Sequence, residues 1–244
     1  GQIQVAGAVK SNKIKKTATS DWMEIEKQRG ISVTTSVMEF DYRDYKINIL
    51  DTPGHQDFAE DTYRTLTAVD SVIIVVDGAK GVETQTRKLM EVCRMRKTPV
   101  IIFVNKMDIM GADFYNVVNM VHERLNANGV PIQLPIGAED TFVGIIDLMN
   151  MDAEIYDDEL GTKFHKDAIP ADMQEKAEEY HQAMVEAICE TDEALLEKFL
   201  SDEEISVNEL KAALRKATIN NEIVPMLCGT AYRNKGVQKL LDAV

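Results

Sequence analysis

The segment Asn105-Lys106-Met107-Asp108 has residue types at a spacing that can recognise one purine base. Guanine presents an N1–H and a 2-amino group side by side, so the carboxylate of Asp108 can accept both hydrogen bonds, whereas adenine has no such edge. The Asn105 side chain can brace the loop and reach the purine, and the methylene stem of Lys106 can lie over the base. These residues predict a guanine-binding loop in which Asp108 sets specificity.

A second polar segment, 51–55, follows the apolar residue Leu50. The carboxylate of Asp51 suits a Mg²⁺ ion that keeps most of its water, because an acid can hold those waters without entering the first shell. Gly54 has no Cβ, so its N–H can approach a γ-phosphate, and His55 beside it can orient an attacking water. We therefore predict that His55 is catalytic. The alternatives are a simple strand followed by a turn, and a surface histidine.

A third polar segment, Gly229-Thr230-Ala231, follows Cys228. The backbone N–H of Ala231 can donate to guanine O6, and the segment is predicted to bind nucleotide. In an open parallel sheet, ligands bind beyond the carboxyl ends of the strands. Three polar strand ends therefore predict one shared site.

The elements that must position these residues follow from hydrophobic periodicity. Short apolar runs alternate with helical stretches, which is typical of an α/β fold with a mostly parallel sheet covered by helices on both faces. The predicted strands are 37–42, 46–50, 72–76, 100–104 and 223–228, and the predicted helices include 84–96, a helix containing Val117, Val121 and Leu125, and 171–188. Capping boxes are predicted at Ser201–Glu204 and Ser206–Glu209.

A long insertion separates two of these strands. Residues 109–222 lie between the strand ending at Val104 and the one beginning at Ile223, although one strand–helix–strand step needs only about 30 residues. Residues 151–222 hold 20 acidic and 7 basic side chains, a net charge of −13 out of −14 for the whole chain. We predict a core of residues 1–140 and 223–244 and an acidic α+β subdomain of residues 141–222, which begins after a strand-like run at 131–136. A solvated helical surface is the plain alternative for the charge.

Composition excludes several classes of protein. No apolar run approaches the roughly 18 residues that a membrane span needs, and no export signal is visible. The three cysteines, Cys93, Cys189 and Cys228, are widely spaced and form no disulfide or zinc pattern. We expect a reduced, cytoplasmic protein. Because the chain begins at Gly1 without an initiator Met, we expect it to start within a longer protein.

These motifs together resemble the translational GTPases, a ribosome-dependent group that includes elongation factor G and peptide chain release factor 3. Residues 9–108 resemble release factor 3 most, whereas residues 111–244 resemble elongation factor G, as does the long acidic insert. The resemblance is therefore that of a hybrid joined near 108–111. The motifs that carry it are 9–13, 22–32 and 51–58 in the first part, and 111–115, 131–140 and 224–238 in the second.

The resemblance implies a P-loop-NTPase-like fold that binds GTP or GDP with Mg²⁺. It assigns residues 29–32 to switch I, where the Ser32 hydroxyl would join Asp51 at Mg²⁺, although Ser32 could simply end a loop. The family holds the α- and β-phosphates with a Gly-x-x-x-x-Gly-Lys-[Ser/Thr] loop, which this sequence does not contain. We expect the first strand and the phosphate loop to be absent, which would unpair the strands 46–50 and 72–76.

The resemblance implies an enzyme that hydrolyses GTP on the ribosome. The insert favours elongation factor G and translocation, the switch segments favour release factor 3 and the recycling of other release factors, and a non-catalytic binding fragment is a further alternative. By itself this fragment is expected to be inactive. The expected partners are the factor-binding region of the large ribosomal subunit and, through the acidic insert, its stalk proteins, with no DNA and no membrane.

Overall fold

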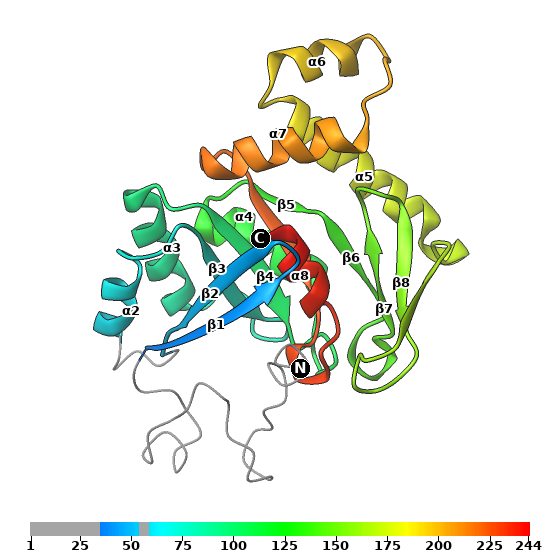
Figure 1. Cartoon of the computed structure of the whole chain (residues 1–244). Helices are drawn as coiled ribbons and strands as arrows, with labels where there is room; N and C mark the ends of the chain where they lie inside the picture. The colour runs from blue at the N-terminus through cyan, green and yellow to red at the C-terminus, as the bar shows by residue number, and fades with distance from the viewer. Residues whose placement is uncertain (1–34, 54–58) are drawn as a thin grey trace.

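A computed structural model describes residues 35–53 and 59–244 of the 244-residue chain. Its centre is a four-stranded parallel sheet with the strand order β3-β4-β10-β5 (Figure 1). The first five residues of β4 are buried, as expected for a strand covered on both faces. The predicted strands 72–76, 100–104 and 223–228 are confirmed to within one residue. The strands are β3 (Val72–Asp77), β4 (Val100–Asn105), β10 (Val224–Cys228) and β5 (Gly129–Pro131).

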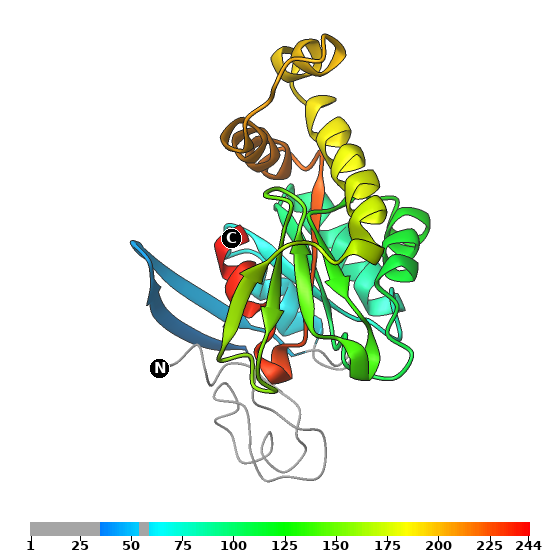
Figure 2. The same cartoon turned by 90° about the vertical axis from the view of Figure 1, so that its right-hand side faces the viewer.

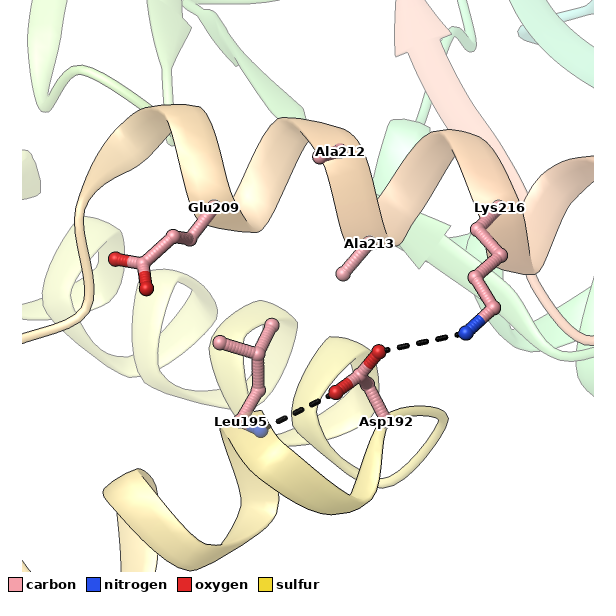
Figure 3. Close-up of a pocket in the computed structure, with 6 residues that line it drawn as sticks. All are labelled: Asp192, Leu195, Glu209, Ala212, Ala213 and Lys216. Atoms are coloured by element: carbon pink, nitrogen blue, oxygen red, sulfur yellow. Dashed lines mark hydrogen bonds and ion pairs between the residues drawn. The ribbon is translucent and has the colours of Figure 1, made fainter.

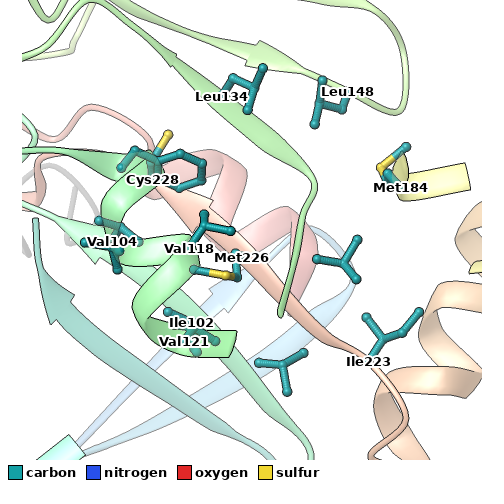
Figure 4. Packing of buried hydrophobic residues seen from close by; sticks show 14 of the residues in the cluster. Ile102, Val104, Val118, Val121, Leu134, Leu148, Met184, Ile223, Met226 and Cys228 are labelled. Carbon is teal, nitrogen blue, oxygen red and sulfur yellow. The ribbon is translucent and has the colours of Figure 1, made fainter. Parts of the chain in front are cut away.

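Helices cover both faces of this sheet. On one face Ile102 and Val104 belong to the main core with residues of α3 (Thr84–Arg96) and α4 (Phe114–Leu125), such as Val121 (Figure 4). On the other face, Ile101, Phe103 and Leu227 form a smaller cluster with Leu240 of α8 (Val237–Ala243). Alternate residues of β4 therefore pack in opposite directions, which confirms the predicted α/β class.

The strands β1 (Ser36–Tyr42) and β2 (Tyr45–Asp51) form an antiparallel hairpin. In the described residues this hairpin is a two-stranded sheet of its own, beside the parallel sheet rather than hydrogen-bonded into it. Its tip contacts α8, because the Tyr42 hydroxyl donates to Asp242 Oδ1 at 2.6 Å and Arg43 pairs with the same carboxylate. The short helix α2 (Ala59–Thr65) precedes β3.

The strand-like run 131–136 contributes to two strands rather than one, because the chain changes sheets at Ile132. The Ile132 N–H donates to Met226 O at 3.0 Å, while Ile132 O accepts from Leu148 N at 3.1 Å. One apolar run thus supplies β5 to the parallel sheet and β6 to an antiparallel sheet of order β6-β7-β8-β9. The strands of that sheet are β6 (Gln133–Ile136), β7 (Gly144–Asp147), β8 (Asp152–Tyr156) and β9 (Phe164–Asp167), with a 3-10 turn η2 (Glu139–Thr141) after β6.

The helices α6 (Glu193–Leu200) and α7 (Val207–Ile219) lie beyond the sheets at one end of the molecule, and α5 (Gln174–Cys189) runs from there alongside the sheets (Figure 2). The predicted helix 171–188 begins as the 3-10 turn η3 (Ala171–Met173), and one stripe of α5, which includes Ala177, Met184 and Ile188, is buried. The division of the chain at residue 141 stays a prediction.

One of the two predicted capping boxes is confirmed. Ser206 caps α7, accepting from Glu209 N, while the Glu209 side chain accepts from Ser206 N. The box at Ser201–Glu204 is wrong, because Ser201 ends α6 instead and its N–H bonds to Glu197 O and Lys198 O. Both Ser-x-x-Glu segments lie in the connection between α6 and α7. Only the one at Ser206 is followed directly by a helix, so only that one forms a capping box.

A shallow pocket lies between α6 and α7 (Figure 3). Its polar side chains cap the two helices and form ion pairs with each other's neighbours. The Asp192 carboxylate caps the first turn of α6 by accepting from Ala194 N and Leu195 N, and it pairs with Lys216 at 3.5 Å. The Glu209 side chain completes the capping box of α7 by accepting from Ser206 N, and it pairs with Lys198 at 2.6 Å. The pocket therefore reflects how the two helices are held together.

Among the helices of the described residues, none is long and apolar enough to cross a bilayer.

Candidate nucleotide-binding site

Two loops meet where the adjacent parallel strands β4 and β10 end. The first loop is Asn105–Asp108, and the second begins at Gly229. Met107 N donates to Gly229 O at 3.1 Å, and Gly229 N donates to Val104 O at 3.0 Å. The carboxyl ends of parallel strands face the same edge of a sheet, which is where ligands bind in open α/β folds. The structure thus brings two of the three predicted polar strand ends together.

The side chains of the first loop are held by the second loop. The Ala231 N–H donates to Asn105 Oδ1 at 2.9 Å, and the Thr230 hydroxyl donates to Asp108 Oδ1 at 2.6 Å. Arg233 Nε lies 3.0 Å from the other carboxylate oxygen of Asp108, whose side chain is only 13% exposed. Asn105 thus links the first loop to the second, and its contact with the purine stays a prediction. The backbone N–H of Ala231, which is predicted to donate to guanine O6, donates to Asn105 Oδ1 in this structure.

Lys106 is held by a residue that the sequence reasoning missed, Asp77. The Lys106 backbone is in the left-handed region at φ 63°, and its Nζ lies 2.8 Å from Asp77 Oδ2. Asp77 also accepts from Ala79 N and Lys80 N. Partial burial would raise the pKa of Asp77, but the hydrogen bonds from Lys106 and the two backbone N–H groups lower it overall. The carboxylate therefore stays ionised and fixes the head of Lys106, whose stem is predicted to cover the base.

The position of Asp77 in the sequence is like that of Asn105, because each is a polar residue at the end of an apolar strand. Asp77 ends the apolar run of β3 as Asn105 ends that of β4, and the two residues are register partners in the parallel sheet. A polar residue at the end of a neighbouring strand is therefore within reach of the loop. The sequence does not show that β3 and β4 are neighbours.

Met107, the third residue of the motif, anchors the loop in the hydrophobic core. Its side chain is fully buried in the main core. Its carbonyl accepts from Glu139 N at 2.8 Å, and Glu139 Oε1 in turn accepts from Gly111 N at 2.7 Å. The loop therefore presents three polar side chains, while its one apolar side chain, that of Met107, packs in the core.

The second loop is closed on itself and rests on the antiparallel sheet. Thr230 and Lys235 exchange two backbone hydrogen bonds, of 3.0 and 3.1 Å. Gly236 follows at φ 86°, a left-handed conformation that suits glycine, and its N–H donates to the Tyr156 hydroxyl at 2.7 Å. That hydroxyl donates to Glu154 Oε1 at 2.8 Å.

The support from β8 is a buried polar chain. Tyr156 and Glu154 are each 5% exposed. Burial raises the pKa of Tyr156, and the neighbouring Glu154 raises it further, so the hydroxyl keeps its proton for that carboxylate. Lys239 of α8 lies 3.1 Å from Asp147 Oδ2 and 3.9 Å from Glu154 Oε2. The sequence reasoning did not identify these residues, because none of them belongs to the three polar strand-end segments 51–55, 105–108 and 229–231.

The remaining predicted residues are placed only in part. Asp51 ends β2 and pairs in register with Ser36 in the hairpin sheet. Ser32, Gly54 and His55 lie outside the described residues. Among the residues that are described, no group of three or more acidic, histidine or cysteine side chains gathers in a way that could hold a metal. The Mg²⁺ roles of Asp51 and Ser32, the phosphate role of Gly54 and the catalytic role of His55 therefore stay predictions.

The donors and acceptors of the two loops suit a guanine base. A nearly buried carboxylate held at both oxygens offers adjacent acceptors, which fits adjacent N–H donors and disfavours adenine. The roles of Asn105, Lys106, Asp108, Gly229, Thr230 and Ala231 in nucleotide binding stay predictions, now with a common location.

Comparison with known proteins agrees with this geometry. A crystal structure of a protein from Thermus thermophilus is similar, with a TM-score of 0.85 and 29% sequence identity. The similarity covers 93% of this chain and 34% of that protein, so this chain spans about a third of its length. Residues 2–244 match the sequence family described as the elongation factor Tu GTP binding domain. The chain therefore belongs to that family, the G domains of the translational GTPases.

Proposed function

We propose that this chain is the guanine-recognising and switch part of a ribosome-dependent translation factor that hydrolyses GTP, and that the factor is elongation factor G, which drives translocation. The observation that carries the proposal is the contact between the two loops: Thr230 and Arg233 hold both oxygens of Asp108, and Asn105 holds Ala231. A carboxylate fixed in this way beside a strand end can recognise guanine by accepting hydrogen bonds from its N1–H and 2-amino group.

The chain's own residues divide the work. Asp108 would accept the two guanine donors, Lys106 would cover the base from its anchor on Asp77, and Gly54 would approach the γ-phosphate. Mg²⁺ bound through Asp51 and Ser32 would neutralise phosphate charge. His55 would orient the attacking water. Family membership supports binding of a guanine nucleotide, while hydrolysis and the residue roles are the proposal.

The choice of elongation factor G rests on the long segment between β4 and β10. It carries the antiparallel sheet, the helices α5–α7 and most of the negative charge, and its amino-acid sequence resembles that of elongation factor G. Release factor 3 is the second candidate, because residues 51–58 and 22–32 resemble it more closely. Both would use the same guanine site.

Two ribosome assays separate these candidates. Residues 1–244 would be joined to a complete phosphate-binding loop and to the downstream domains of the family. GTP-dependent movement of messenger RNA through the ribosome is expected. GTP-dependent release of other termination factors without such movement would favour release factor 3, and ribosome binding without hydrolysis would favour a non-catalytic module.

For residues 1–244 alone, we predict that GTP binds hardly better than guanosine. The sequence contains no Gly-x-x-x-x-Gly-Lys-[Ser/Thr] loop, so the triphosphate meets no such nest of N–H groups and no such lysine. A calorimetric or NMR titration of both ligands should give weak affinities within a few-fold of each other, with adenosine as the control. Micromolar GTP affinity would contradict this and would show that another segment binds the phosphates.

A further prediction concerns the acidic face of α5 as a contact for ribosomal stalk proteins. Glu175, Glu178, Glu179 and Glu186 are all exposed, on the side opposite the buried stripe. Ribosomal RNA repels such a surface, so a basic or apolar protein surface is the expected partner. Replacing all four by Gln should slow ribosome association and flatten its salt dependence, with GTP binding unchanged.

Stopped-flow association at several salt concentrations measures this effect. Glu190, Glu193, Glu203 and Glu204 are also exposed but lie outside α5, so changing them to Gln is a control with the same loss of charge. If the α5 variant and this control behave like the unchanged protein, the acidic face is only a solvated surface. If both slow association equally, net charge rather than α5 is responsible.

A further inference from the structure

Arg233 contacts the residue predicted to bind guanine, although it lies outside the three polar strand-end segments 51–55, 105–108 and 229–231. Its Nε lies 3.0 Å from Asp108 Oδ2, and the Thr230 hydroxyl lies 2.6 Å from Asp108 Oδ1. The Asp108 side chain is 13% exposed and that of Arg233 is 40% exposed. The arginine thus approaches a mostly buried carboxylate from the solvent side of the loop, while the threonine takes the other oxygen.

The backbone around Arg233 is fixed by short-range hydrogen bonds. Its N–H donates to Thr230 O at 3.1 Å, within the 3-10 turn η4 (Ala231–Arg233). Asn234 ends this turn in the left-handed region at φ 56°, and its N–H donates to Ala231 O. The loop is then closed by the exchange of hydrogen bonds between Thr230 and Lys235. The guanidinium therefore extends from a constrained turn, in contrast to an ordinary surface ion pair.

Arg233 also faces other charges. Lys235 lies close enough that its pKa is lowered, first by its own burial and then by the positive charge of Arg233. The carboxylates of Asp108, Asp158 and Glu159 act on the pKa of Lys235 in the opposite direction, and Asp108 is the one that Arg233 contacts. The pair is thus part of the loop's charge balance.

Holding both oxygens fixes the plane of the carboxylate. An ionised carboxylate offers about four lone-pair positions, so two bonds within the protein leave acceptors for the base. Guanine needs both oxygens in the plane of its N1–H and 2-amino group, and a carboxylate that is already oriented loses less side-chain freedom when guanine binds. With Oδ2 released, the carboxylate could pivot about its remaining bond to Thr230.

We propose that Arg233 is a positioning residue for guanine discrimination, which holds Asp108 Oδ2 in place for the second of the two guanine donors. This inference rests on the proposed function of the site. It assigns Arg233 a role beyond the four-residue motif, and it separates two parts of recognition that Asp108 performs together: presenting a negative charge and presenting two oxygens in one plane.

Nucleosides test the proposal with the 244-residue chain, because they probe the base site without the phosphates. Guanosine has both donors, whereas inosine lacks the 2-amino group and needs only one oxygen. Titrations followed by the amide NMR signals of Asp108 and Ala231 measure affinities as weak as millimolar. With Arg233→Met, guanosine affinity should fall roughly three- to tenfold, while inosine affinity changes by less than about twofold.

Two controls isolate the contact. Arg215→Met removes the same charge from an exposed position on α7 and should leave both affinities unchanged. In an Asp108→Ala background, Arg233→Met should have no further effect on guanosine, because the group it positions is gone. Circular dichroism and the dispersion of the NMR spectrum establish that each variant is folded, and Arg233→Gln, which keeps more of the side chain's shape, is measured in parallel.

The outcomes are distinct. Equal losses for guanosine and inosine would show that Arg233 only stabilises the loop, and tighter guanosine binding would show that it competes with the base; either result overturns the inference. Guanosine preferred over inosine and adenosine in the unchanged chain, with no effect of Arg233→Met or Arg233→Gln, overturns the inference while the proposed function stands. No preference for guanosine in the unchanged chain overturns the proposed function of the site, and the inference with it.

Discussion

Replacing Asp108 by Asn is expected to weaken binding of guanine nucleotides by about 100-fold or more and to shift preference toward xanthine nucleotides. The carboxylate accepts from two donors, whereas an amide has one acceptor and turns a donor toward the base. Guanine then faces donor against donor at one position. Xanthine carries a 2-oxo group there, which suits the amide donor. The contacts of Asp108 strengthen this expectation, since Thr230 holds its Oδ1 and Arg233 holds its Oδ2.

Competition between labelled GDP and unlabelled GDP, XDP and ADP measures this change, in a protein where residues 1–244 are joined to a complete phosphate-binding loop. Asp113→Asn is the matched control. Asp113 lies a short distance along the chain and caps α4 by accepting from Asn116 N, a role that asparagine also fills. The prediction is contradicted if the unchanged protein binds GDP and ADP equally, or if Asp108→Asn keeps its preference for GDP over XDP.

Replacing His55 by Ala is expected to lower ribosome-stimulated GTP hydrolysis by about 100-fold or more, with GTP affinity changed by no more than a few-fold. The proposed role of the side chain is to orient water rather than to contact the nucleotide. Its loss therefore affects the transition state and leaves ground-state binding nearly intact. His55 lies outside the described residues, so this expectation rests on the sequence and on family resemblance.

Single-turnover hydrolysis on ribosomes and fluorescent-nucleotide binding are measured on the same restored protein. His122→Ala, at an exposed position of α4, is the control for loss of an imidazole elsewhere. A loss of affinity as large as the loss of rate would show that His55 binds nucleotide. An unchanged rate would assign the orientation of water to another residue.

The parts of the fold that could be predicted are those where local pattern and tertiary environment agree. The run Val100–Val104 is β-branched and buried, and it lies between two layers of helices, so hydrophobicity alone locates it. The helix Thr84–Arg96 has the predicted bounds, because it is amphipathic and Lys97 ends it in the left-handed region at φ 56°. The loops after β4 and β10 were also predictable, because polar motifs directly follow apolar strands.

The features that could not be predicted depend on which segments become neighbours. The change of sheet at Ile132 is decided by Met226 and Leu148, both distant in the sequence, whose backbone groups bond to it. Nothing in a six-residue apolar run distinguishes one strand from two. The same holds for Arg233 and Asp77, since a charged residue gains a role at the site only when topology places it beside Asp108 or Lys106.

The bond from the Gly236 N–H to the Tyr156 hydroxyl has a consequence for protein engineering. A base-recognition cassette cut from this protein cannot consist of the two loops alone. On another scaffold, residues 229–236 would lose the buried hydroxyl that receives Gly236 and the Glu154 acceptor behind it. An unmatched buried donor costs about 1–3 kcal/mol, which would loosen the turn. The smallest transferable unit is discontinuous and includes residues 105–108, 154–156 and 229–236, so recombination among GTPases that exchanges the antiparallel sheet also exchanges the residues that support the predicted base site.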